Sequence, residues 1–258
     1  MNYSTPILPL KLEDVSFQAG GKRLIKELNC EFGPGPRSVI IGPNGAGKSL
    51  FLKICHGLIP PHTGTVKWND PNDTSARRYQ AMVFQRPVML RRSVSANIHY
   101  PLKLRKIPKA ERIVLVEEAL TISGISRFRD HSARVLSFGE QQKLALARAW
   151  ALKPQVLFLD EPTASLDPAA THTVEEIIHA IHKQGTKIIM TTHDLAQAKR
   201  IADEVLFMFR GRLLERAPAN KFFEQPENDL AQSFVKGELL WQRMGKAHQK
   251  HKYSEMTK

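Results

Sequence analysis

Alternation of apolar and polar residues near the start of the chain predicts a β-rich segment. Residues 10–17, LKLEDVSF, alternate roughly between the two classes, and RLIKELNCEF at 23–32 follows the pair Gly20–Gly21. A glycine pair between two such runs is typical of a hairpin. GPGP at 33–36 predicts a second turn, and SVII at 38–41 is then a short apolar strand.

Helical spacing of apolar residues appears next. Residues 48–59, KSLFLKICHGLI, place their apolar positions on one helical face, and Pro60–Pro61 should end that helix. Two further β segments are predicted at 63–70 and 81–85. From about residue 86 to 152 the apolar spacing stays near 3.6 residues, which predicts an inserted helical subdomain.

Continuous apolar runs mark the second half of the chain. VLFLD at 156–160 and KIIMTTH at 187–193 suit parallel strands buried on both faces. A helix is predicted between them at 171–185, another follows at 194–202, and residues 204–215 predict a terminal β pair.

This order of elements predicts an α/β fold with a mostly parallel core sheet, an antiparallel β annex and the helical insertion. The chain has 258 residues, which suits one large domain. We expect that domain to cover residues 8–242 and a basic, polar tail to cover 243–258.

Composition excludes several protein classes. Apolar residues make up 42% and charged residues 24%, as in an ordinary globular protein rather than a collagen-like or disordered one. No apolar run approaches the roughly 20 residues of a membrane-spanning helix, and the first residues lack a secretory signal. We therefore expect a cytosolic protein that touches a membrane only through a partner.

Cys30 and Cys55 cannot form a disulfide framework and are expected to be buried thiols.

The net charge of +13, from 38 basic and 25 acidic residues, suggests an anionic partner. Nucleic acid, acidic lipid and nucleotide phosphate all fit, as does a basic surface kept for solubility or docking. No arginine-rich block with interleaved aromatic residues is present, which disfavours nucleic acid.

One segment predicts a phosphate-binding loop. Residues 42–49 match G-x-x-x-x-G-K-[ST], follow a predicted strand and open a predicted helix. Such a loop curls so that backbone N–H groups face phosphate oxygens at a helix N-terminus. Lys48 should bridge the β- and γ-phosphates of a nucleotide, and Ser49 should bind Mg²⁺. The predicted ATP-binding residues are Gly42, Pro43, Asn44, Gly45, Ala46, Gly47, Lys48 and Ser49.

The apolar strand at 156–160 delivers two acids to its carboxyl end. Asp160 is placed where P-loop enzymes hold a carboxylate on Mg²⁺. Glu161 would then lie beside the γ-phosphate and could orient or deprotonate the attacking water. By itself such a pair is more often a loop or a helix cap, but the upstream phosphate loop favours the catalytic reading.

The segment Leu136-Ser137-Phe138-Gly139-Glu140 strongly resembles the signature of the nucleotide-binding subunit of ATP-binding-cassette (ABC) transporters, with Phe138 where the family usually has glycine. Ser137 and Glu140 also form the S-x-x-E pattern of a capping box. In the family this helix start faces the γ-phosphate held by the other subunit of a dimer. The resemblance therefore implies that Ser137, Gly139 and Glu140 contact ATP in trans.

The resemblance covers about residues 10–240 and implies further roles. Gln85 is the Q-loop glutamine, touching Mg²⁺ or the attacking water, and His193 is the switch histidine on the γ-phosphate. Phe17 sits where the family stacks an aromatic ring on adenine, with ordinary core packing as its alternative. Residues 165–167, SLD, correspond to the D-loop.

By resemblance the partners are a second copy of the chain, integral membrane permease subunits and, indirectly, an extracytoplasmic solute-binding protein, at the cytoplasmic face of the membrane. No nucleic acid partner is expected. The stretch after Gln85 looks most like oxyanion importers of the tungstate type, with phosphate, molybdate and amino-acid importers as alternatives.

Three other interpretations stay open, and the first is that the chain is the subunit of an exporter. A soluble ABC-type ATPase acting on nucleic acid or ribosomes would explain the basic charge, although such proteins usually carry two cassettes or a long insert. One predicted helix places His172, Glu175, His179 and His182 at spacings that could hold a metal, but a solvated helix face is favoured.

Overall fold

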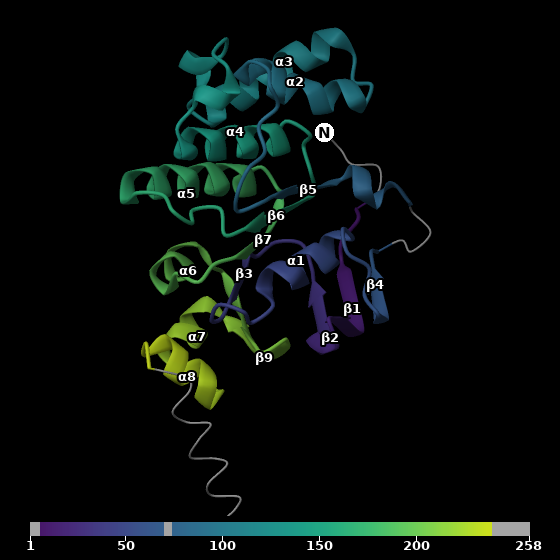
Figure 1. The fold of residues 1–258 in the computed structure, drawn as a ribbon, viewed down its shortest axis with the longest axis vertical. Helices are drawn as coiled ribbons and strands as arrows, with labels where there is room; N and C mark the ends of the chain where they lie inside the picture. The colour runs from purple at the N-terminus through teal and green to yellow at the C-terminus, as the bar shows by residue number, and fades with distance from the viewer. Residues whose placement is uncertain (1–5, 70–73, 239–258) are drawn as a thin grey trace, which may run out of the picture.

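The computed structural model describes residues 6–69 and 74–238. Its centre is a six-stranded sheet in which the first five strands run parallel and the last is antiparallel (Figure 1). The strand order is β5 (Gln80–Val83), β6 (Val156–Asp160), β7 (Lys187–Thr191), β3 (Ser38–Ile41), β8 (Glu204–Phe209) and β9 (Arg212–Pro218). The mostly parallel core sheet predicted from the apolar runs is confirmed.

A separate antiparallel sheet of three strands forms the annex. Its order is β2 (Lys22–Phe32), β1 (Leu10–Ala19) and β4 (Thr63–Lys67), so β1 is central. Its buried side packs on α1 (Lys48–His56), since Leu12 and Val15 belong to the same core cluster as Phe51 and Leu52. The annex therefore lies against the helix that begins at the predicted phosphate loop.

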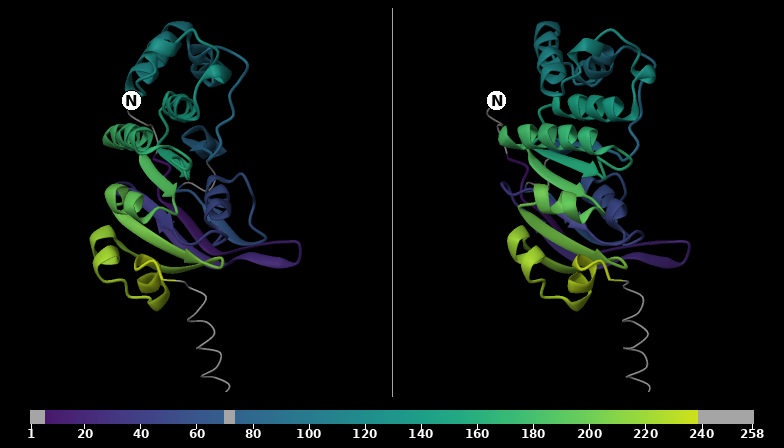
Figure 2. Two further views of the ribbon diagram at one scale, coloured as in Figure 1. Left: turned by 60° about the vertical axis from the view of Figure 1, so that its left-hand side comes forward. Right: turned by 90° about the vertical axis from the view of Figure 1, so that its left-hand side faces the viewer.

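The core sheet is buried on both faces, because alternate residues of each strand enter two different clusters. In β6, Leu157 and Leu159 face one cluster, while Val156 and Phe158 face the other. The first cluster is covered by α5 (Pro168–Lys183) and α6 (Leu195–Ile201), and the second by α1 (Figure 2). Continuous rather than alternating apolar sequences follow from this two-sided burial.

Three longer helices form the insertion at one end of the molecule (Figures 1 and 2). They are α2 (Val94–Leu104), α3 (Lys109–Ile122) and α4 (Phe138–Trp150). Short 3-10 turns occur at Ser126–Phe128 and Ala133–Val135, and another, Thr74–Arg78, precedes β5. The helix α4 contacts α2 and α3 on one side and α5 and β5 on the other. It therefore joins the insertion to the sheet.

Several boundaries differ from the sequence predictions. The helix α1 ends at His56 rather than near Pro60, because Gly57 adopts a left-handed conformation and caps it. The helix α5 starts before residue 171, because the Asp167 side chain caps it and Pro168 fills its first turn. Two helices were not predicted, α7 (Ala219–Glu224) and α8 (Asp229–Val235). With six and seven residues they are too short to show a helical period.

None of the helices in residues 6–69 and 74–238 has the length and apolar composition needed to cross a membrane. Both cysteines are free; Cys55 is buried as predicted, whereas Cys30 is only partly buried, so that prediction was wrong for Cys30. The predicted tail, residues 243–258, and residues 239–242 of the predicted domain lie outside the described part of the chain.

Candidate active site

The segment 42–49 leaves β3 and turns directly into α1, as the phosphate-loop pattern predicts. Two glycines are required by the backbone. A Cβ atom at Gly42 would lie 2.0 Å from the Met208 carbonyl oxygen, and Gly47 has φ 99° with the Leu24 carbonyl 3.2 Å from its Cβ position. Side chains at these positions would displace the loop from β2 and β8.

Lys48 is folded back over this loop. Its ammonium group donates hydrogen bonds to the carbonyl oxygens of Gly42, at 2.8 Å, and Pro43, at 3.3 Å. Only 5% of the residue is exposed, and the Glu161 carboxylate lies 3.7 Å from the ammonium. Burial lowers the pKa of Lys48, while the charges of Glu161 and Asp160 act in the opposite direction. A buried cation thus lies at the mouth of the phosphate loop.

Asp160 ends β6 beneath the loop and is buried. One of its oxygens, Oδ1, accepts hydrogen bonds from the hydroxyls of Ser49, at 2.7 Å, and Thr191, at 2.8 Å. Serine and aspartate oxygens are the hard ligands that Mg²⁺ prefers, so this pair fits the predicted cation. Thr191 was missed in the sequence, where its signal was a polar residue closing the apolar run of β7.

Glu161 connects most of the other predicted residues. Its Oε2 atom lies 2.9 Å from Nδ1 of His193 and accepts a hydrogen bond of 3.5 Å from the Gln85 amide. Gln85 and His193 each lie two residues beyond the ends of β5 and β7, rather than ending those strands as predicted. Glu161 itself has φ 45°, a conformation that costs a residue other than glycine about 1–3 kcal/mol. The contacts of its carboxylate with Lys48 and His193, and of its backbone N–H with Thr191, accompany this unusual conformation.

A single cleft contains these groups. Its volume is 530 Å³, and its walls combine the phosphate loop with Gln85, Glu161 and His193. Charged and amide side chains from the ends of three parallel strands therefore converge on one space. The ends of parallel strands are where open α/β sheets bind ligands.

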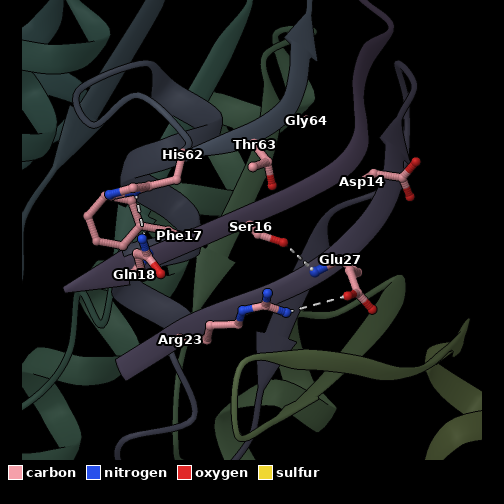
Figure 3. Close-up of a pocket in the computed structure, with 9 residues that line it drawn as sticks. All are labelled: Asp14, Ser16, Phe17, Gln18, Arg23, Glu27, His62, Thr63 and Gly64. Carbon is pink, nitrogen blue, oxygen red and sulfur yellow. Dashed lines mark hydrogen bonds and ion pairs between the residues drawn. The ribbon is translucent and has the colours of Figure 1, made fainter. Parts of the chain in front are cut away.

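Phe17 lies apart from that cleft, on the annex. It borders a pocket of 360 Å³ on the three-stranded sheet, and its ring meets the ring of His62 edge-on at 4.8 Å between centroids (Figure 3). The cleft beside the phosphate loop is bordered by Leu24 instead. His62 was not predicted, because no local pattern connects it with a residue so distant in the sequence.

The predicted signature begins α4, and the capping box is confirmed. The Ser137 hydroxyl accepts from the Glu140 amide at 3.4 Å, and the Glu140 carboxylate accepts from the Ser137 amide at 2.9 Å. Burial acts to raise the pKa of Glu140, but hydrogen bonds from Ser137 outweigh it and hold this pKa below its usual value. Gly139 packs toward α5, and the side chain of Phe138 is 37% exposed. None of these residues borders the phosphate-loop cleft.

The polar face of α5 has structural partners. Glu175 binds Arg200 and Gln197, His179 lies 3.1 Å from the Arg37 guanidinium, and His172 pairs with Glu176. No group of three or more candidate metal ligands occurs among residues 6–69 and 74–238.

Comparisons with known proteins give a consistent result. Residues 25–164 match the family described as "ABC transporter". Over 205 residues the chain is 40% identical to the tungstate uptake system ATP-binding protein TupC of Peptoclostridium acidaminophilum, covering 79% of this chain and 94% of TupC. It is 35% identical over 235 residues to the phosphate import ATP-binding protein PstB of Mycoplasmoides gallisepticum, covering 84% and 72% of the two chains.

A solved structure shares the fold. The dimeric structure of a post-hydrolysis state of the ATP-binding cassette MJ0796, bound to ADP and Pi, superimposes with a TM-score of 0.72 at 27% identity. The similarity covers 81% of this chain and 98% of that one.

Proposed function

The chain belongs to the ABC transporter family, and from that membership we propose that it is the ATP-binding and ATP-hydrolysing subunit of an importer. One observation supports the assignment most strongly: Lys48, Asp160, Glu161 and His193 converge at one edge of the core sheet. Groups of these kinds bind the phosphates of a nucleoside triphosphate, neutralise their charge and promote hydrolysis in enzymes that transfer phosphoryl groups.

Binding of ATP is assigned to the phosphate loop. Lys48 would exchange its two carbonyl partners for phosphate oxygens, and the backbone amides of α1's first turn would face the same anion. Mg²⁺ would be held by Ser49, Asp160 and Gln85. The Ser49 hydroxyl donates a hydrogen bond to Asp160, so the oxygen atoms of these two residues lie together. When bound, Mg²⁺ supplies charge neutralisation on the phosphate oxygens.

Hydrolysis is assigned to Glu161 and His193. Glu161 would accept a proton from the attacking water, and His193 would hold the Glu161 carboxylate in place through its Nδ1 contact. Gln85 touches the same carboxylate from the loop after β5, where the chain continues into the helical insertion. A change at the γ-phosphate could therefore reach the insertion through the hydrogen bond between Glu161 and Gln85 and the short stretch of backbone from Gln85 to α2.

Ser137, Gly139 and Glu140 are proposed to complete the site of a second copy. They begin α4 outside the cleft of their own chain, and a helix N-terminus is suited to bind an anion. We propose that Phe17 stacks on adenine. The remaining partners in this proposal are permease subunits in the membrane and an extracytoplasmic binding protein, with the chain at the cytoplasmic face.

The proposed cargo is an oxyanion, with tungstate first. This follows the similarity to TupC, and phosphate is the next candidate from the similarity to PstB. Molybdate and polar amino acids remain the other candidates. Both of these relatives are ATP-binding proteins of uptake or import systems, which argues against action on nucleic acid or ribosomes.

Replacement of Lys48 tests the enzymatic assignment. We expect Lys48→Ala to lower kcat/KM for ATP by about 10²–10³-fold, because a charged contact to the phosphates is lost. Lys53→Ala, in the same helix but outside the cleft, should retain activity. An undiminished rate in Lys48→Ala would reject the assignment.

The cargo is tested in the assembled transporter. The chain, its cognate permease and a binding protein are reconstituted in vesicles, and ATP hydrolysis is measured with tungstate, molybdate, phosphate or amino acids supplied to the binding protein. We expect tungstate to stimulate hydrolysis most. Stimulation by phosphate alone would move the cargo assignment to phosphate.

A further inference from the structure

The hairpin of α2 and α3 carries basic charge that the nucleotide site does not use. Residues 94–122, which span both helices, contain five lysine and arginine residues and three acids, Glu111, Glu117 and Glu118; four of the five basic residues fall within 103–109, a stretch that has no acid. In Figures 1 and 2 this hairpin forms one extremity of the molecule, with α4 between it and the core sheet. The hairpin therefore lies away from the phosphate loop, although one of its basic residues, Arg105, turns back onto the fold, where its Nη1 donates to the Leu152 carbonyl at 3.2 Å.

Positive groups gather along the hairpin. Arg112 donates from Nε to Nε2 of His99 at 3.1 Å and from Nη1 to the Ile107 carbonyl at 2.9 Å, which fixes its guanidinium between the two helices. Burial lowers the pKa of His99, and the charges of Arg112, Lys103 and Lys109 lower it further. Three cations thus act together on one imidazole.

The lysines of the tip are open to solvent. Lys103 lies in the last turn of α2, Lys106 lies in the connection and Lys109 begins α3, and all three are exposed. None of the three has an ion-pair partner in the described part of the chain. Their charges are consequently available to an external anion.

Apolar side chains lie beside these lysines. Leu104 is 65% exposed, and Ile113 and Val114 are 52% and 56% exposed. Ile113 lies four residues after Lys109, so the two share a face of α3, while Leu115 and Val116 turn into the core. Val114, the residue after Ile113, faces another side of α3. Single exposed apolar residues are ordinary, but Leu104 and Ile113 adjoin the cluster of lysines and form an amphipathic surface with it.

We propose that this hairpin tip binds an anionic phospholipid surface. Lys103, Lys106 and Lys109 would pair with lipid phosphates, and Leu104 and Ile113 would enter the headgroup boundary. Basic side chains around an apolar face are typical of elements that lie on a membrane, and basic residues are drawn to anionic leaflets. The contact would add a direct lipid attachment to the one that a permease provides.

Other anionic partners would use the tip differently. An acidic protein segment or the phosphates of a nucleic acid would pair with the lysines, but neither requires Leu104 and Ile113 to enter an apolar phase. Charge and apolar contributions measured separately on vesicles therefore distinguish lipid from these occupants.

The experiment measures co-sedimentation of the full-length chain with vesicles of phosphatidylcholine, alone or with about one third phosphatidylglycerol. Lys103→Glu/Lys106→Glu/Lys109→Glu removes the basic tip. Lys22→Glu/Lys199→Glu/Lys236→Glu changes net charge equally at exposed lysines elsewhere. Leu104→Ser/Ile113→Ser removes the apolar part. Residues 243–258 are present in every variant, so their contribution cancels.

We expect the wild type to bind only the anionic vesicles. The variant with three charge reversals at the tip should have a partition coefficient lower by about 100-fold or more, because each lysine lost costs roughly fivefold. The variant with three reversals elsewhere should lose less than about threefold. The serine variant should lose several-fold and become more sensitive to salt.

Three results would overturn the proposal: equal losses in the two charge reversals, equal binding to neutral vesicles, or an unchanged serine variant. Duplex DNA that binds the tip while vesicles do not would assign the surface to nucleic acid instead. ATP hydrolysis is measured on every variant and should be unchanged, because these residues lie outside the cleft. A wild type that binds vesicles but hydrolyses no ATP would refute the proposed function and leave this inference standing.

Discussion

The phosphate-loop cleft and the start of α4 are built in opposite ways. At the cleft, Lys48 and Asp160 are buried and contact residues from distant parts of the chain: Lys48 lies 3.7 Å from the Glu161 carboxylate, and Asp160 accepts a hydrogen bond from Ser49. At the start of α4, Ser137 and Glu140 bond mainly to each other, and Phe138 is exposed. The side chains of the cleft are therefore fixed by contacts between distant segments. The start of α4 is stabilised by contacts within the helix, and part of it is exposed to solvent.

This difference supports the proposal that a catalytic site is divided between two copies. The cleft region combines the buried Lys48 cation, the Asp160 carboxylate and the Glu161–His193 pair within one chain. The start of α4 needs no partner to fold, because its capping box satisfies its first amides. It can therefore bind and release the facing site of another copy without losing its own structure.

The largest effect is expected inside the cleft. Glu161→Gln removes the group proposed to accept the proton from water, and hydrolysis should fall by about 10²–10⁴-fold. ATP affinity should change little, because the phosphate loop is intact, and ATP should accumulate a closed dimer visible by size-exclusion chromatography. Glu176→Gln, at an exposed acid of α5, is the matched control. Wild-type turnover in Glu161→Gln would reject the role given to Glu161.

An intermediate effect is expected at the start of α4. Ser137→Ala and Ser93→Ala each remove the side-chain cap of a helix, α4 and α2 respectively, and should lower stability alike by about 1 kcal/mol. Only Ser137→Ala should also lower kcat/KM for ATP, by about 10–100-fold, through a lost bond to phosphate. Thermal unfolding and steady-state kinetics measure the two effects. An equal loss of kcat/KM in both variants would show that Ser137 acts only as a helix cap.

The smallest effect is expected at Phe138. Because its side chain is exposed beside the cap, Phe138→Gly should retain or raise ATP hydrolysis by allowing closer approach of the α4 backbone to phosphate. The measurement is the steady-state rate at saturating ATP. A loss greater than about tenfold would show that the aromatic ring has a positive role.

The buried strands were predicted from the sequence more accurately than the short helices and the ends of the elements. The strands at 38–41 and 156–160 were predicted residue for residue, because two-sided burial leaves an unbroken apolar run. The helices α7 and α8 were missed, because one or two turns show no period. Boundaries failed where one residue decides the end, as Gly57 does for α1.

The candidate site was predictable where a motif fixes the backbone. The phosphate loop and the two acids after β6 followed from local sequence, but the bonds of Asp160 to Ser49 and Thr191 did not. Those contacts depend on sheet order, which places β6 and β7 side by side. The same limit applies to the pairing of Phe17 with His62 on the annex.

The central claim, that each catalytic site is shared by two copies, is tested most directly by mixing two inactive variants. Lys48→Ala disables the cleft and Ser137→Arg blocks the start of α4. A mixed dimer would contain one intact site, formed by the cleft of the Ser137→Arg chain and the α4 start of the Lys48→Ala chain. The account predicts that the mixture hydrolyses ATP well above the sum of the separate samples. A rate equal to that sum, from samples shown to form mixed dimers, would contradict it.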